Sequence, residues 1–218
     1  MKKMILHILF PALVLGSLCL SAQADTVTYQ VTVNTSSQSG NYGYIDLSLN
    51  QGTSSALPVT ASITGFAGGT LNPADGANDA IGTSGDLAST LTIPAATSTD
   101  YIEGLTFGNW ISFDITFSGT GVNLAGLAGG DSGTTFVLQF YDSAISSMLL
   151  TSDSSGATGF INIAPEGTVS VEALPGPEGG DSLATIVATP EPSTLSFFAC
   201  AGAAFLLLHR RFVGMGIR

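Results

Sequence analysis

The stretch from Asp25 to Thr189 contains no lysine, arginine, histidine or cysteine. It is 165 residues long, and an ordinary stretch of that length would hold about 20 basic residues. The residues of these four types all lie nearer the two ends of the chain: Lys2, Lys3, His7, Cys19, Cys200, His209, Arg210, Arg211 and Arg218. The absence therefore belongs to the middle of the chain and restricts the chemistry that can occur there.

Each absence excludes a class of site from the middle stretch. Without Lys or Arg it cannot neutralise phosphates, which excludes nucleic-acid binding and phosphoryl transfer. Without His, Lys or Cys it has no Ser-His-Asp or Cys-His arrangement, no Schiff-base lysine and no imidazole or thiolate zinc site. Without Cys it has no disulfide, so an exported domain must be stabilised by its core alone. Carboxylate pairs of the glycosidase type and oxygen-ligand calcium sites remain.

The charge of the middle stretch is of one sign. The chain holds 16 acidic residues, of which only Glu191 lies outside residues 25–189, so this stretch carries 15 acids and a formal charge of −15. Such a domain is repelled by nucleic acid and by anionic lipid head groups, and it is repelled by acidic polysaccharide unless divalent cations bridge the two. We expect no nucleic-acid partner, and contact with a membrane only through the terminal segments.

Residues 1–24 have the pattern of a secretory signal peptide. Two lysines precede the apolar run Met4–Leu20, and the small residues Ala22 and Ala24 form a signal peptidase site. The mature chain then begins at Asp25, after cleavage by signal peptidase.

Two alternatives for the N-terminal segment stay open. A lipoprotein would be acylated at Cys19, although Leu18 stands where a small residue is expected. An uncleaved anchor is the other, because the apolar run is long and is interrupted by Pro11.

Residues 190–218 combine a proline-flanked acid, a short apolar run and a basic pair. As a helix, the apolar run Leu195–Leu208 would be about 21 Å long, which is shorter than a hydrocarbon core of about 30 Å. The arginine side chains that follow can reach to the membrane surface and so lengthen the effective span. With basic residues outside both apolar segments, the positive-inside rule keeps both termini in the cytoplasm and translocates the acidic middle. The three parts are Pro190-Glu191-Pro192, Leu195–Leu208 and Arg210-Arg211.

The order of these parts resembles the PEP-CTERM sorting tail of exopolysaccharide-producing Gram-negative bacteria. The resemblance implies an exosortase partner, an integral-membrane cysteine transpeptidase-like enzyme that removes the tail near Pro190, Glu191 and Pro192. The protein would be anchored in the inner membrane before processing and would reach the cell surface or extracellular matrix afterwards. One departure is the extension from Phe212 to Arg218, which is longer than usual. A permanent single-pass anchor is the alternative reading of the tail.

The middle stretch shows a period of two. In residues 26–33, Val27, Tyr29, Val31 and Val33 alternate with polar residues, as in a half-buried strand. Similar runs separated by Gly, Ser, Asn and Asp clusters predict an all-β fold, an antiparallel β-sandwich of jelly-roll type. The predicted strands are 26–33, 44–50, 59–66, 87–93, 101–107, 110–118, 134–142, 147–151, 159–163 and 168–173.

The domain is predicted to span residues 25–173, followed by a linker at 174–189 that holds a candidate edge strand, Leu183–Ala188. Its core is predicted from the alternation of two strands. The core-facing residues are Ile111, Phe113, Ile115, Phe117, Phe136, Leu138 and Phe140.

Two segments of the mature chain, Thr26–Thr35 and Phe136–Val171, also resemble a group of exported PEP-CTERM proteins. That resemblance implies a fold class and no particular reaction.

A candidate calcium site lies in the loop 72–79, where Asp75, Asn78 and Asp79 gather three oxygen side chains within five residues. Asx-type turns explain the same residues without an ion. Asp131 and Asp153, in other glycine-containing turns, allow the same two interpretations.

Two outward-facing surfaces are candidates for sugar binding, because aromatic rings stack on pyranoses and carboxylates accept hydroxyl hydrogen bonds. One holds Tyr42, Tyr44 and Asp46, and the other holds Trp110 and Asp114. The alternative is that these aromatics fill strand ends or pack on the second sheet. Catalysis would need two carboxylates about 5–9.5 Å apart, and Asp46 and Asp114 are the strand carboxylates that face away from the core.

These observations predict an exported, exosortase-processed surface or matrix protein that associates with exopolysaccharide and is not an enzyme. The alternative is a carbohydrate-binding or adhesin-like module, assisted by calcium.

Overall fold

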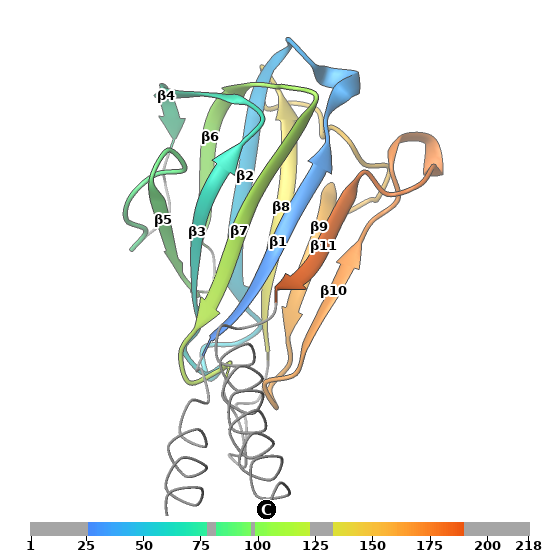
Figure 1. Ribbon diagram of the computed structural model, residues 1–218. Coiled ribbons are helices and arrows are strands. Elements are labelled where there is room, and N and C mark those ends of the chain that lie inside the picture. The colour runs from blue at the N-terminus through green and yellow to red at the C-terminus, as the bar shows by residue number, and fades with distance from the viewer. Residues whose placement is uncertain (1–25, 78–81, 97–98, 123–132, 190–218) are drawn as a thin grey trace, which may run out of the picture. The chain divides into compact units, whose positions relative to one another are not determined.

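The computed structural model describes residues 26–77, 82–96, 99–122 and 133–189 (Figure 1). They form two antiparallel sheets that enclose one hydrophobic core, which is the predicted all-β, sandwich-like class. The first sheet has the strand order β11-β1-β7-β3-β5, and the second has the order β10-β9-β8-β2-β6-β4. The strands are β1 Thr26–Asn34, β2 Tyr42–Gln51, β3 Thr60–Ala67, β4 Thr70–Ala77, β5 Thr90–Pro94, β6 Asp100–Thr106, β7 Trp110–Ser118, β8 Thr134–Asp142, β9 Ala157–Ile163, β10 Val169–Ala173 and β11 Ala184–Thr189.

The only helical elements in the described ranges are two 3-10 turns, η1 Ser36–Gln38 and η2 Pro177–Gly179. None of the described residues form a helix long and apolar enough to cross a membrane. The predicted signal peptide, residues 1–24, and the predicted sorting tail, residues 190–218, lie outside the described residues.

The predicted core residues are confirmed. All seven lie between the two sheets with at most 1% of their surface exposed. On β7, residues with buried side chains alternate with half-buried Ser112, Asp114 and Thr116, the pattern of a strand with one face on the core. Edge-to-face rings of Phe117 and Phe136, 6.0 Å apart, join the two sheets at the centre.

The structure contradicts two of the strand predictions. Residues 147–151 form no full strand. Asp142 accepts hydrogen bonds from the backbone N–H groups of Ala144 and Ser146 and turns the chain back, so that Met148 forms a single isolated bridge with Tyr141 of β8. Leu150 enters the core from a left-handed conformation, with φ of 64°. Conversely, β4 was predicted as a loop because of its turn-forming residues. As an edge strand it needs only a partial ladder to β6, which is interrupted between Asn72 and Ala77.

The candidate edge strand predicted at Leu183–Ala188 is confirmed: the segment described as a linker contributes β11 to the edge of the first sheet. β11 pairs antiparallel with β1 over six residue pairs, from Thr28 opposite Thr189 to Val33 opposite Ala184. In Figure 1 it lies beside β1 at the edge of the sheet. Ala184 and Ile186 pack against the core. Residues 25–189, with β11 included, therefore form one compact unit.

We predict that residues 25–189 fold alone, and that shortening them to 25–183 lowers the free energy of unfolding. Loss of β11 uncovers the edge of β1 and apolar core surface, which costs at least about 3 kcal/mol, the effect of exposing one or two large apolar side chains. Urea unfolding followed by Trp110 fluorescence measures the difference. Val187→Thr, at a site that is 55% exposed, is the control and should change stability by less than about 0.5 kcal/mol. Equal stability of the two lengths would contradict an integral β11.

Candidate functional site

The outer face of the second sheet gathers aromatic and acidic side chains on its central strand. Alternation on β2 sends Ile45 and Leu47 into the core, and Tyr42 and Tyr44 to the opposite face. The two tyrosine rings meet edge to face, with their centroids 5.6 Å apart and their planes at 74°. Both side chains are half-buried, so the pair leaves aromatic surface open to a ligand.

A hydrogen bond fixes the outer of these rings. The Tyr42 hydroxyl donates to Asp75 Oδ2 at 2.7 Å, and the Asn72 side-chain amide donates to the same oxygen at 2.9 Å. Desolvation and the bond to Asp75 raise the pKa of the Tyr42 hydroxyl. The ring crosses β6 where Gly104 has no side chain, and a Cβ at that position would overlap the Tyr42 hydroxyl.

Asp75 was one of three predicted calcium ligands, and its carboxylate accepts the two hydrogen bonds just described. Asn78 and Asp79, the other two, lie outside the described residues. Asp131 also lies outside them, whereas Asp153 caps its own turn through the N–H and hydroxyl of Ser155. In the part of the chain that the structure describes, no group of three or more His, Cys, Asp or Glu side chains is arranged to hold a metal.

Asp46 lies deeper in the same face than the sequence suggests. It is 7% exposed, and its Oδ1 has no hydrogen-bond partner. Its cross-strand neighbours are Ile102 on β6 and Gln139 on β8. Burial, and to a lesser degree the nearby Asp100 carboxylate, raises the pKa of Asp46 to about 7.

Tyr141 completes the cluster from β8, directly opposite Tyr44. Burial and then the carboxylates of Asp46 and Asp100 raise the pKa of Tyr141, so both acids lie within electrostatic reach of its hydroxyl. That hydroxyl donates to Gln139 Oε1 at 3.4 Å. We define the tyrosine face as these side chains of the second sheet: Tyr42, Tyr44, Asp46, Asn72, Asp75, Asp100, Gln139 and Tyr141.

Four members of the tyrosine face, and the glycine beneath Tyr42, were missed from the sequence. Alternation shows which way a residue on one strand points, but only strand order and register show which strands become neighbours. Register places Tyr141 beside Tyr44, and Gly104 on the other side of it. Asn72 was hidden because its strand reads as a loop.

Trp110 and Asp114 do not join the tyrosine face. Both lie on β7 of the first sheet, where Trp110 is 47% exposed and Asp114 alternates with buried residues. The outer faces of two packed sheets are separated by more than the roughly 10 Å between the sheets themselves. Asp46 and Asp114 therefore cannot act as a glycosidase pair, which needs about 5–9.5 Å.

A second buried carboxylate lies inside the sandwich. Glu103 faces the core from β6, with 2% of its surface exposed, and its Oε2 accepts a hydrogen bond of 2.6 Å from the Tyr101 hydroxyl. Burial, and then the hydrogen bond to Glu103, raise the pKa of Tyr101. Glu103 Oε1 has no partner. The alternation on its strand places this acid on the same face as the core residues Tyr101 and Leu105.

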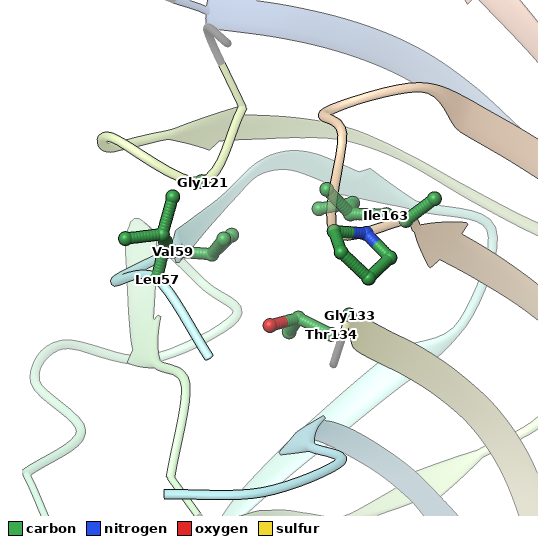
Figure 2. Close-up of a pocket in the computed structure, with 8 residues that line it drawn as sticks. Leu57, Val59, Gly121, Gly133, Thr134 and Ile163 are labelled. Carbon is green, nitrogen blue, oxygen red and sulfur yellow. The ribbon is translucent and has the colours of Figure 1, made fainter. Parts of the chain in front are cut away.

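The described residues also enclose a small opening between strand ends (Figure 2). Leu57, Val59 and Gly121 lie on one side of it and Ile163 on the other, with Thr134 between them. Its described lining holds no titratable side chain. This opening therefore offers no acid, base or charged ligand, and the tyrosine face is the better candidate site.

Comparison of the chain with protein-family models, curated protein sequences and solved structures gives no match. Chemically, the tyrosine face offers ring surface for stacking, oxygen acceptors for hydroxyl groups, and two neighbouring carboxylates that can share a proton or a cation.

Asp46→Asn should remove a pH dependence of stability. The carboxyl has an ordinary pKa of 3.8 and a folded-state pKa of about 7, so the folded state binds the proton more tightly than the unfolded chain. The free energy of unfolding is then highest below pH about 4 and falls as the pH rises to about 7, by on the order of 4 kcal/mol if the whole shift is expressed. Urea unfolding across this pH range measures the decline.

The acids whose pKa values are lowered, Asp142, Asp153 and Glu166, act in the opposite direction. Their contribution is lost only as the pH falls below the ordinary carboxyl range, outside the window of Asp46. An equal decline in the wild type and in Asp46→Asn would contradict the assignment to Asp46.

Proposed function

We propose that this chain is an exported, non-enzymatic surface or extracellular-matrix protein that is processed by an exosortase and associates with exopolysaccharide. The observation that carries the proposal is the tail, with Pro190-Glu191-Pro192, an apolar run and Arg210-Arg211 in that order behind a secretory signal pattern. A domain without any basic residue or cysteine is consistent with a matrix protein that has no nucleic-acid or redox role.

The finer architecture belongs to this proposal. The two sheets correspond to a jelly-roll-like sandwich, the first 24 residues to a cleaved signal peptide, and residues 195–208 to a short transmembrane helix that is present until processing. β11 ends at Thr189, next to Pro190, so exosortase would act directly beside the folded unit.

Carbohydrate binding by the tyrosine face is the second candidate function. It is favoured by the fixed position of Tyr42, which Asp75 holds across Gly104, with Tyr44 packed edge to face beside it. Rigid amphipathic rings give contact area at low entropic cost, and the carboxylates and amides around them can accept or donate hydrogen bonds to sugar hydroxyls. The face would bind neutral or cation-bridged segments of polysaccharide, because its own charge is negative.

We predict that residues 25–189 co-sediment with the producer's own exopolysaccharide and that Tyr44→Ala weakens this binding about tenfold, equivalent to about 1.4 kcal/mol. Loss of one stacking ring is the physical reason. Trp110→Ala is the matched control, because it removes an exposed ring from the other sheet and should leave binding unchanged. Binding is measured with calcium and with chelator. Absence of binding in both buffers would leave a passive coat component and would reject the carbohydrate-binding role.

Replacing Arg210 and Arg211 by Asn tests the sorting tail. Without the basic pair, orientation and recognition of the tail are impaired, so the unprocessed precursor should accumulate in the inner membrane. Immunoblots of membrane and released fractions from the producing strain measure the ratio of precursor to processed protein. Lys replacements, which keep the charges, are the control. Normal processing and release of the Asn variant would contradict the sorting assignment.

A further inference from the structure

The acids of residues 25–189 have no basic partner anywhere in that stretch, which contains no Lys, Arg or His. An acid that is exposed to water needs no partner, because water and dissolved ions screen its charge. An acid that is buried must be compensated by hydrogen-bond donors, by a proton or by a bound cation. The buried acids are therefore the places to look for a ligand.

Two acids of the described residues are buried, Asp46 and Glu103. Glu103 has a partner, the Tyr101 hydroxyl, at 2.6 Å. The other oxygen of Glu103 is buried without a donor, as is Oδ1 of Asp46. Asp46 differs because no described residue donates a hydrogen bond to its carboxylate, and because it lies on the outer face of the sheet and not in the core. Even the more exposed acids Asp75 and Asp142 accept two or more hydrogen bonds. Asp46 is thus a buried acid on the outer face whose carboxylate has no hydrogen-bond donor among the described residues.

A second carboxylate stands next to it. Asp100 begins β6 and lies directly opposite Ser48, while Asp46 lies opposite Ile102 on the same pair of strands. Residues two apart on a strand share a face, so Asp46 and Asp100 are diagonal neighbours on the outer face. Their mutual repulsion contributes to the perturbed titration of Asp46. Two acids brought together in this way stabilise each other only when positive charge is placed between them.

Two oxygen-bearing side chains, Ser48 and Gln139, are neighbours of the pair in register. Ser48 is 5% exposed and lies between the two acids in register. Gln139 lies opposite Asp46 on β8, with its amide nitrogen bonded to the Ser155 carbonyl at 3.0 Å and its Oε1 turned to Tyr141. Carboxylate, hydroxyl and amide oxygens are the ligands that calcium accepts, in irregular shells that water molecules complete.

We propose that Asp46 and Asp100 bind a divalent cation of the calcium type on the outer face of the second sheet. With only two carboxylates, the protein supplies part of the coordination shell. The remaining positions belong to water or to oxygen atoms of an approaching ligand. The site differs from the loop 72–79, since Asp75 accepts hydrogen bonds from Tyr42 and Asn72. Sites with few charged ligands bind calcium with dissociation constants of about 10⁻⁴–10⁻³ M, the range of extracellular modules.

Terbium luminescence tests the site, because Tb³⁺ replaces Ca²⁺ and is excited by energy transfer from nearby tyrosine. Tyr141 lies within electrostatic reach of both acids. The full chain in mild detergent, titrated with Tb³⁺, should give sensitised emission that excess Ca²⁺ reverses. Asp46→Asn and Asp100→Asn should each weaken Tb³⁺ binding at least about tenfold. Asp114→Asn, which removes one carboxylate from the other sheet, is the matched control and should bind as the wild type does.

Thermal unfolding of the same proteins separates binding from misfolding. Calcium should raise the melting temperature of the wild type and of Asp114→Asn, because a cation that binds the folded state stabilises it. In chelator, Asp46→Asn should melt no lower than the wild type, since it removes a buried unpaired charge, and calcium should not shift it.

Wild-type-like Tb³⁺ binding by Asp46→Asn would overturn the proposal. A melting temperature that depends on pH but not on calcium would also overturn it, since the pair would then hold a proton. No polysaccharide is present in either measurement. Failure here therefore leaves the carbohydrate-binding role to be judged by co-sedimentation alone.

Discussion

Residues 25–189 form a folded unit of 165 residues without one positive side chain. Within this unit, only hydrogen-bond donors can compensate the negative charges of its carboxylates. Turn carboxylates such as Asp142 and Asp153 accept hydrogen bonds from local N–H and hydroxyl groups. Glu103 accepts one from a neighbouring tyrosine. Asp46 accepts no hydrogen bond from the described residues, and its Oδ1 is buried. The lack of a donor for Asp46 distinguishes the tyrosine face, because a buried charge that no group of the chain compensates needs a proton or a cation from the solvent.

The tyrosine face is built around an interior strand of the second sheet. β2 is hydrogen-bonded on both sides, to β6 and to β8, and its core face carries Ile45, Leu47 and Leu49 with no exposed surface. Side chains on the opposite face inherit that rigidity, since every second residue of the strand is fixed in the core. Tyr42 is further restrained by Asp75. A ligand that binds here would therefore meet tyrosine rings that already hold their positions.

Much of this arrangement follows from the sequence, and the remainder depends on register. Alternation correctly predicted the buried face of β7 and the outward direction of Tyr42 and Tyr44. On a strand each side chain points to one of two faces of the sheet, so the apolar residues show which face is buried. It could not predict that Tyr141 lies beside Tyr44, or that Asp100 approaches Asp46, since these contacts join strands far apart in the chain. Burial of Asp46 was missed for the same reason: an outward residue is covered by side chains of the neighbouring strands.

Local turn chemistry accounts for the other differences. Asp142 accepts hydrogen bonds from the N–H groups of the following residues and ends β8. The chain that returns makes only one bridge, at Met148, before Leu150 adopts a left-handed conformation. β4 carries the residues of a turn, yet an edge position tolerates a broken ladder. At residues 147–151 the local turn outweighs the apolar pattern, and at β4 the edge position outweighs the turn-forming composition.

The pairing of β11 with β1 has a mechanical consequence. Thr28 lies opposite Thr189, so the two ends of the folded unit leave the same end of the same sheet. A pull applied at Thr189 along the strand direction loads the hydrogen bonds between β11 and β1 together, in shear, and cannot open them one at a time. A domain held at this corner and bound to a polymer through its other sheet would resist detachment as a unit, with the strain distributed along the full length of its last strand.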